Sequence, residues 1–189
     1  MNAKLISRVL ILTGRNGVGK SFVIASCTNS VSAALHIRRE LRSICGARAE
    51  AVYRNSMERR STDHLELMAS KLTEIGSTHH NLLIEGVLWP EEIHWFRRLY
   101  ASASVIWIEA DTGTRVERVM RRECIPEADA IRTVKSSDLF RERLGLHEIR
   151  EMANRRVNGA CDRAVSCIGE FLVLGGSNVA NGCVCTRDC

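Results

Sequence analysis

Short apolar runs alternate along this chain with longer segments whose apolar residues recur every three or four positions. Residues 8–13, 81–86 and 104–110 are short and almost continuously apolar, which is typical of strands buried on both faces of a parallel sheet. A weaker apolar run over residues 162–168 predicts one last strand. These four segments are the strands that we expect from the pattern alone.

The segments between the strands have helical spacing. The pattern predicts helices over residues 20–30, 32–45, 61–75, 90–100, 111–122 and 126–144. Gly76 is expected to end the third of these helices, and Pro90 to open the fourth, where a helix needs no backbone donor. Strands separated by helices of this length require crossover connections. The expected fold is therefore α/β, with three layers in which helices cover both faces of a parallel sheet.

The strongest chemical signal directly follows the first strand. Gly14, Gly19, Lys20 and Ser21 match the pattern G-x-x-x-x-G-K-[ST] of a phosphate-binding loop between a strand and a helix. Lys20 is expected to reach the β- and γ-phosphates of ATP, and the Ser21 hydroxyl to hold Mg²⁺. The predicted ATP-binding residues are Gly14, Arg15, Asn16, Gly17, Val18, Gly19, Lys20, Ser21 and Phe22.

Phosphoryl transfer also needs a carboxylate near the metal ion. Glu85 stands at the end of the strand over residues 81–86, and ligands of open α/β sheets bind at the carboxyl ends of the strands. We therefore expect Glu85 to contact Mg²⁺, either directly or through a water molecule. The alternative role for Glu85 is to orient the acceptor. Glu109 and Asp111 follow the next strand and are the alternatives.

Arginines supply the positive charge that such a transfer needs. Arg115, Arg118 and Arg122 share one face of the predicted helix over residues 111–122, and Arg118 and Arg122 are the candidates for catalysis. Arg38 and Arg39 could hold a phosphate group of the acceptor. For each of these arginines, a solvated helix surface is the alternative interpretation.

Composition narrows the classes of function. Hydrophobic residues make up 45% and charged residues 26% of 189 residues, and no run reaches the roughly 18 apolar residues of a membrane span. A cytoplasmic protein without a membrane partner is expected. The net charge of +5 fits phosphorylated small molecules as well as nucleic acid. Nucleic acid is nevertheless disfavoured, because Trp89, Trp95 and Trp107 form no stacking platform within a basic patch.

The chain length favours one domain over residues 1–174, followed by an irregular, cysteine-rich tail over residues 175–189. Within the domain, we expect an acceptor-binding insertion at about 30–80 and a lid at about 112–145. The oligomeric state is left open by the sequence.

Several segments together resemble the nucleoside monophosphate kinase branch of P-loop proteins, especially its dephospho-CoA kinase-like and deoxynucleoside monophosphate kinase-like members. The segments are residues 14–21, 82–100, 105–122, 138–146 and 160–170, and the first is the specific one. The resemblance implies that Gly17, Gly19, Lys20 and Ser21 bind ATP and magnesium. It also implies that Arg118 and Arg122 belong to the lid and that Glu85 takes the place of the acidic residue before a glycine.

The sequence departs from this family at two places. Several relatives have Asp where this chain has Glu85, and an arginine where it has Leu88. The predicted last strand is followed in many relatives by an asparagine, where this chain has Ser166 and Cys167. These departures affect the expected contacts with the acceptor and with adenine.

Two hypotheses of different classes follow. The first is an ATP-dependent small-molecule kinase whose acceptor is a nucleoside monophosphate, with dephospho-CoA as the alternative. The second is a nucleotide-binding switch or an inactive P-loop NTPase module. The segment over residues 30–80 contains no motif that decides between the acceptors.

Overall fold

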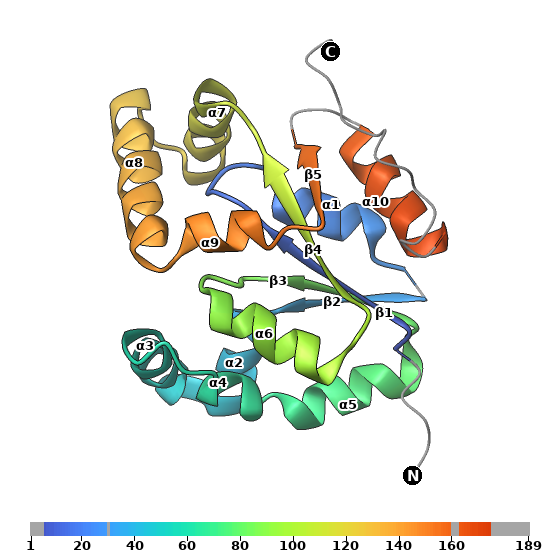
Figure 1. Ribbon diagram of the computed structural model, residues 1–189. Coiled ribbons are helices and arrows are strands. Elements are labelled where there is room, and N and C mark those ends of the chain that lie inside the picture. Colours follow the sequence, from blue (N-terminus) through green and yellow to red (C-terminus); the bar gives the residue numbers. More distant parts are fainter. Residues whose placement is uncertain (1–5, 30, 160–162, 175–189) are drawn as a thin grey trace.

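The computed structural model describes residues 6–29, 31–159 and 163–174. Its centre is a five-stranded sheet in the order β2-β3-β1-β4-β5, in which every neighbouring pair of strands is parallel (Figure 1). The strands are β1 (Arg8–Thr13), β2 (Ser32–His36), β3 (Asn81–Glu85), β4 (Ala103–Glu109) and β5 (Arg155–Asn158). All five carboxyl ends therefore lie at one edge of the sheet.

Alternate side chains of the strands enter two separate apolar clusters, as the pleat requires. On β1, Leu10 and Leu12 pack with α1 (Lys20–Cys27) and α10 (Arg163–Leu174) on one face. Val9 and Ile11 face the opposite and larger cluster. That face is covered by α2 (Ile37–Cys45), α3 (Ala49–Glu58), α4 (Asp63–Glu66), α5 (Ala69–Thr78), α6 (Pro90–Leu99) and α9 (Leu146–Glu151).

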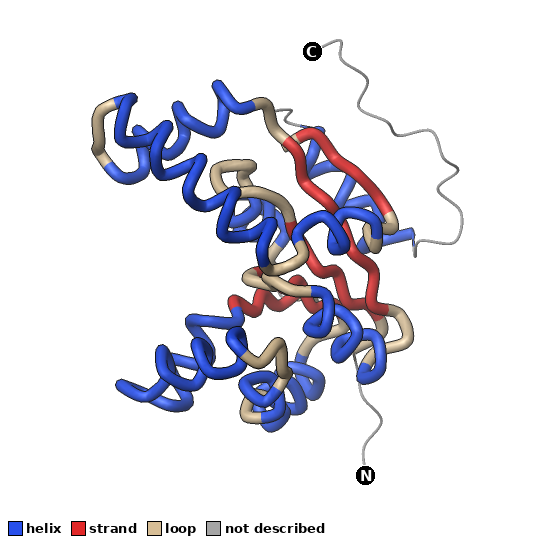
Figure 2. The backbone as a smooth tube through the Cα atoms, turned by 60° about the vertical axis from the view of Figure 1, so that its left-hand side comes forward, coloured by secondary structure: helices blue, strands red, loops and turns tan. Residues whose placement is uncertain are grey.

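Two further helices, α7 (Thr112–Glu123) and α8 (Glu127–Arg143), extend beyond the carboxyl edge of the sheet (Figure 2). They pack against each other around a third cluster, which is formed by Val116, Val119, Ala130 and Val134. The apolar core of this pair is therefore separate from the two cores of the sheet. No helix in the described part of the chain is long and apolar enough to cross a membrane.

The structure confirms the predicted three-layer α/β fold. Strands β1, β3 and β4 and helices α1, α6, α7 and α8 lie where the pattern predicts them, within a few residues at their ends. Pro90 is the first residue of α6, as predicted. Trp89, Trp95 and Trp107 are buried. The predicted tail over residues 175–189 lies outside the described residues.

Three predicted elements are wrong. Residues 32–36, predicted as the start of a helix, form β2 because Ser32, Ala33 and Leu35 pair beside β3. The helix predicted over 61–75 is divided between α4 and α5, and Gly76 does not end it but lies inside α5, where it packs against Ile6.

The third error concerns the last strand. Residues 163–168 belong to α10, and the last strand of the sheet is β5. The hydrophobic pattern missed β5 because this edge strand has four residues, of which only Val157 is fully buried. The comparison of Ser166 and Cys167 with a family asparagine was therefore misplaced, since the strand that ends the sheet closes on Asn158.

Candidate active site

The loop between β1 and α1 has the backbone that a tight turn against its neighbours requires. Gly14 has a φ of 137°, and a Cβ atom at this position would lie 2.3 Å from the Ile108 carbonyl oxygen. Gly17 has a φ of 81°, and its Cβ would lie 2.8 Å from the Arg115 carbonyl oxygen on α7. Side chains at either position would strain the backbone and displace a neighbouring element. The two glycines thus hold the loop between β4 and α7.

Cationic side chains donate hydrogen bonds to four successive carbonyl groups of this loop. Lys20 Nζ donates to the carbonyls of Gly14 and Arg15, at 3.1 and 2.8 Å. Arg115 Nε donates to Asn16 O at 2.7 Å, and Arg118 Nη1 donates to Gly17 O at 3.3 Å. The last contact comes from α8, where Arg141 Nη1 donates to Gly14 O at 3.1 Å. The loop is thus surrounded by positive charge.

Three of these cations have no carboxylate within ion-pair distance in the described part of the chain. Lys20 and Arg141 donate to the loop carbonyls, while Arg118 also donates from Nη2 to Gly159 O at 2.9 Å. Burial, with the neighbouring Arg141 guanidinium, lowers the pKa of Lys20 to about 7. Burial likewise lowers the pKa of Arg141. Cations held in this way, with no carboxylate in ion-pair contact among the described residues, favour an anionic ligand.

Ser21 and Glu85 meet beside the loop. The Ser21 hydroxyl donates to Glu85 Oε1 at 2.8 Å, which joins the first turn of α1 to the end of β3. The pairing of the strands explains this contact, since Glu85 lies opposite Leu12 of β1. The structure therefore brings together the hydroxyl and the carboxylate that the sequence predicted around a magnesium ion.

The two alternative carboxylates have other partners. Glu109 accepts from the Arg150 guanidinium at 3.0 Å. Asp111 is the N-cap of α7, where its carboxylate accepts from the backbone N–H and the hydroxyl of Thr114. The hydrogen bond from the Thr114 hydroxyl lowers the pKa of Asp111. Glu85 is the one of these three candidates that contacts Ser21.

The arginines predicted on one face of α7 occupy different environments. Arg115 is buried and forms an ion pair with Asp138 of α8 at 2.6 Å, in addition to its contact with the loop. Arg122 is more than half exposed; it pairs with Glu123 at 2.6 Å and reaches Asn16 Oδ1 only at 3.4 Å. Of the two candidates for catalysis, Arg118 therefore lies against the loop and Arg122 lies at its margin.

The predicted contacts with the acceptor are not brought to the loop. Arg38 donates to both carboxylate oxygens of Glu50, at 3.1 and 2.9 Å, and stacks over the Tyr53 ring. The Arg39 side chain is 68% exposed and lies 3.9 Å from Glu40. Of the predicted ATP-binding residues, Val18 is buried and Phe22 exposes its ring to solvent.

Sequence reasoning missed two residues of the site. Arg141 lies in the long charged helix α8, where nothing in the pattern separates it from Arg143 or the other exposed arginines. His36 ends β2, a strand that the pattern had assigned to a helix, and its Nε2 lies 3.8 Å from Glu85 Oε1. Correct assignment of β2 would have placed His36 beside Glu85, because the two residues are register partners.

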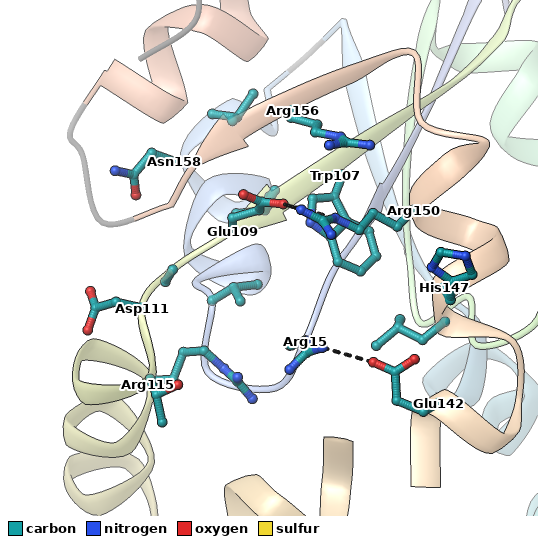
Figure 3. A pocket seen from close by; sticks show the side chains of 16 residues that line it. Arg15, Trp107, Glu109, Asp111, Arg115, Glu142, His147, Arg150, Arg156 and Asn158 are labelled. Atoms are coloured by element: carbon teal, nitrogen blue, oxygen red, sulfur yellow. Dashed lines mark hydrogen bonds and ion pairs between the residues drawn. The ribbon is translucent and has the colours of Figure 1, made fainter. Parts of the chain in front are cut away.

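A cavity of about 640 Å³ lies beside the loop, at the carboxyl ends of β4 and β5 (Figure 3). Arg15 reaches into it from the loop and pairs with Glu142, while the Glu109–Arg150 pair lies on the opposite wall. The remaining walls include Val18, Trp107 and Asn158. The cavity is therefore continuous with the loop that carries the phosphate-binding sequence.

No protein-family profile and no curated protein matches this sequence. Solved structures do match it. An uncharacterised protein from Eubacterium ventriosum has a TM-score of 0.59 at 13% identity, over 88% of this chain and 96% of that chain. Shikimate kinase from Acinetobacter baumannii, in complex with shikimate, has a TM-score of 0.52 at 15% identity, over 90% and 93%.

Shikimate kinase from Bacteroides thetaiotaomicron gives a TM-score of 0.51 at 12% identity, over 87% of this chain and 95% of that chain. At these identities the likeness concerns the fold. Taken with the parallel sheet and the loop over residues 14–21, it shows that this chain has the three-layer α/β fold of the P-loop kinases.

Proposed function

We propose that this protein is an ATP-dependent small-molecule kinase. The observation that carries the proposal is the group of Lys20, Arg118 and Arg141 around one glycine loop, beside the Ser21–Glu85 pair. Phosphoryl transfer is catalysed mainly by positioning and by positive charge that follows the moving group. Arg118 and Arg141 come from α7 and α8, so this site supplies charge from outside the loop as well as from Lys20.

Magnesium fits the residues at this site. The Ser21 hydroxyl and the Glu85 carboxylate are hard oxygen donors, of the kind that Mg²⁺ prefers. Ser21 would bind the ion directly and Glu85 would bind it through water. When bound, Mg²⁺ neutralises charge on the β- and γ-phosphates.

The nucleoside half of ATP would occupy the cavity beside the loop. Its walls include Arg15 and Val18 of the loop itself and the ends of β4 and β5, where open α/β sheets bind ligands. Asn158, at the end of β5, is the residue that we assign to the place of the family asparagine. The amide of this side chain can both donate and accept a hydrogen bond from a base.

The acceptor is a small molecule that approaches the γ-phosphate from the side of β2 and β3. A nucleoside monophosphate and dephospho-CoA are the candidates that the sequence resemblance suggests. Shikimate joins them because two of the structural neighbours are shikimate kinases. A nucleoside monophosphate would receive the phosphoryl group on a phosphate oxygen, whereas dephospho-CoA and shikimate would receive it on a hydroxyl.

The experiment that tests the kinase proposal measures ADP formation from ATP and Mg²⁺ with each acceptor in turn. We expect turnover to rise with at least one acceptor. Lys20→Ala is expected to lower that turnover roughly 100-fold or more, because the phosphates lose a buried cation. The matched control is Lys71→Ala, since Lys71 pairs with Glu74 on the surface of α5. ADP formation at the same rate with and without every acceptor would instead favour a slow NTPase.

A bulky residue tests the position assigned to the nucleoside. Thr112 is exposed at the start of α7 and lines the cavity. We expect Thr112→Trp to weaken ATP binding about 10-fold or more while inorganic triphosphate binds as before, because only ATP needs the cavity. Isothermal titration calorimetry with both ligands measures the difference. The control is Thr78→Trp on α5, and equal losses for both ligands would contradict the assignment.

A further inference from the structure

His36 and Glu85 stand side by side at the ends of two neighbouring strands. They are register partners in the pairing of β2 with β3, and His36 Nε2 lies 3.8 Å from Glu85 Oε1. Both side chains remain partly accessible, His36 at 38% and Glu85 at 13%. The pair therefore faces the space on the side of the loop away from the cavity at β4 and β5.

The hydrogen bonds of His36 indicate which ring nitrogen carries the proton. His36 is the N-cap of α2, and its Nδ1 accepts from the backbone N–H of Arg39 at 3.4 Å. In the neutral ring the hydrogen is then on Nε2, which is the atom that faces Glu85. The ring is thus held as a hydrogen-bond donor toward the carboxylate.

The separation of the pair leaves room for a third group. At 3.8 Å the ring nitrogen and the carboxylate oxygen are too far apart for a direct hydrogen bond, and one bridging oxygen can satisfy both. Glu85 Oε1 already accepts from Ser21, whereas Oε2 has no partner among the residues that the structure describes. A hydroxyl group placed here could accept from His36 Nε2 and donate to the Glu85 carboxylate.

A phosphate group would find less to bind at the same place. Arg38 has both carboxylate oxygens of Glu50 as partners, and Arg39 is largely exposed beside Glu40. A phosphate acceptor is already ionised near neutral pH and needs cations rather than a proton acceptor. A hydroxyl acceptor needs a group that takes its proton, and the Glu85 carboxylate, 3.8 Å from His36 Nε2, is such a group.

Resting on the kinase function proposed above, we infer that the acceptor is an alcohol, held by its hydroxyl between His36 and Glu85. The hydroxyl oxygen forms a bond to the γ-phosphorus, and the bond from that phosphorus to the β,γ-bridging oxygen breaks. ADP leaves with the bridging oxygen. The hydroxyl proton passes to the Glu85 carboxylate and then to water. The product is a phosphate monoester.

The chemical stability of the product tests this inference directly. The protein is incubated with Mg²⁺ and ATP that carries a radioactive γ-phosphate, in one arm with alcohols including shikimate and dephospho-CoA, in the other with nucleoside monophosphates. In the arm with alcohols, we expect transferred label that survives brief heating in dilute acid, because phosphate monoesters are stable under these conditions. Acid-labile label on the nucleoside monophosphates would overturn the alcohol assignment and leave the kinase function standing. Release of inorganic phosphate alone would overturn both.

A substitution that preserves the helix cap isolates the role of the His36 ring. His36→Asn keeps a side chain that can accept from Arg39 N–H, since asparagine is a good N-cap, but removes Nε2. We expect kcat with the alcohol to fall roughly 10- to 100-fold, while the KM for ATP stays within about twofold. The matched control is His80→Asn, because His80 is exposed at the opposite end of β3. An unchanged kcat, or an equal loss in ATP binding, would refute the role of His36.

Discussion

At the scale of single residues, the charge of Lys20 depends on what the loop holds. Its pKa is lowered to about 7 by burial and by Arg141, so above pH 7 the amine is largely neutral in the free protein. A bound triphosphate favours the charged form. We therefore compare proton uptake by the wild type and by Lys20→Met when each binds inorganic triphosphate at pH 8 without divalent metal. The wild type is expected to take up close to one proton more than the variant. Calorimetry in buffers of different ionisation enthalpy measures this number.

The same pKa fixes the direction of the pH dependence. Near pH 6 Lys20 already carries its proton before the ligand binds. The difference in proton uptake between the wild type and Lys20→Met should therefore be smaller than at pH 8. In the absence of ligand, the unfolded chain binds more protons than the folded chain between about pH 7 and pH 10.5, so this lysine makes folding more favourable as pH rises through that window. Equal proton uptake by the wild type and the variant at pH 8 would show that Lys20 does not meet the phosphates.

Residues of the site differ in how far the sequence could predict them. Lys20 and Ser21 belong to a short sequence pattern whose spacing is enough to predict the geometry of the loop. The position of Glu85 could be predicted because it stands at the end of a strongly apolar strand. Arg141 could not be found in this way, because its contact with Gly14 O joins positions 127 residues apart. Such a contact depends on how α8 lies over the loop, and the spacing of residues within one segment does not predict this arrangement.

At the scale of elements, the start of α6 depends on one buried glutamate. Glu92 Oε2 accepts from the backbone N–H groups of Leu88 and Trp89, at 2.6 and 3.2 Å. Its Oε1 lies 2.8 Å from Nε2 of His64, and both side chains are fully buried. Burial raises the pKa of Glu92. This glutamate therefore fixes the turn that leads from β3 into α6.

Replacement of Glu92 should be costly for that reason. Glu92→Ala would leave two N–H groups and the His64 ring without a partner in the core, and we expect the free energy of unfolding to fall by about 3–5 kcal/mol. Urea denaturation measures the change. Glu91→Ala is the control on the same helix, since Glu91 is partly exposed beside Arg60 and should lose about 1 kcal/mol or less. Similar losses for both variants would contradict this account.

Elements were predictable where the apolar pattern was long or strong. The errors at β2 and β5 share a cause, because both are edge strands of five and four residues. The buried residues Ala33 and Leu35 of β2 are followed directly by Ile37 and Leu41 of α2. Together the four residues fit a helical spacing, so the pattern predicts one helix. Only pairing with β3 separates the strand from the helix, and that pairing joins residues far apart in the sequence.

At the scale of the whole molecule, α7 and α8 form a unit of their own. Their apolar cluster is separate from the cores of the sheet, and their contacts with the phosphate loop are polar, through Arg115, Arg118 and Arg141. The pair should therefore open more readily than the sheet. On the proposed function, ATP with Mg²⁺ would bind to the same cations that connect the helix pair to the loop.

We expect ATP with Mg²⁺ to slow hydrogen exchange across residues 112–143, while β1 and β4 exchange slowly in both states. Exchange followed by mass spectrometry measures each segment. Lys20→Ala serves as the control, since it should remove the protection of α7 and α8 along with that of the loop. Protection confined to residues 14–22 would show that the two helices are independent of the bound nucleotide.

The hydrogen bonds to the loop carbonyls also bear on the order in which the chain folds. The arginines that donate to Asn16 O, Gly17 O and Gly14 O are 99, 101 and 127 residues further along the chain. Contacts of such long range form late, after the loops between them have closed. During synthesis from the N-terminus, the phosphate-binding sequence is therefore complete long before its final shape is. Affinity for nucleotide should appear only once the chain has emerged as far as α8.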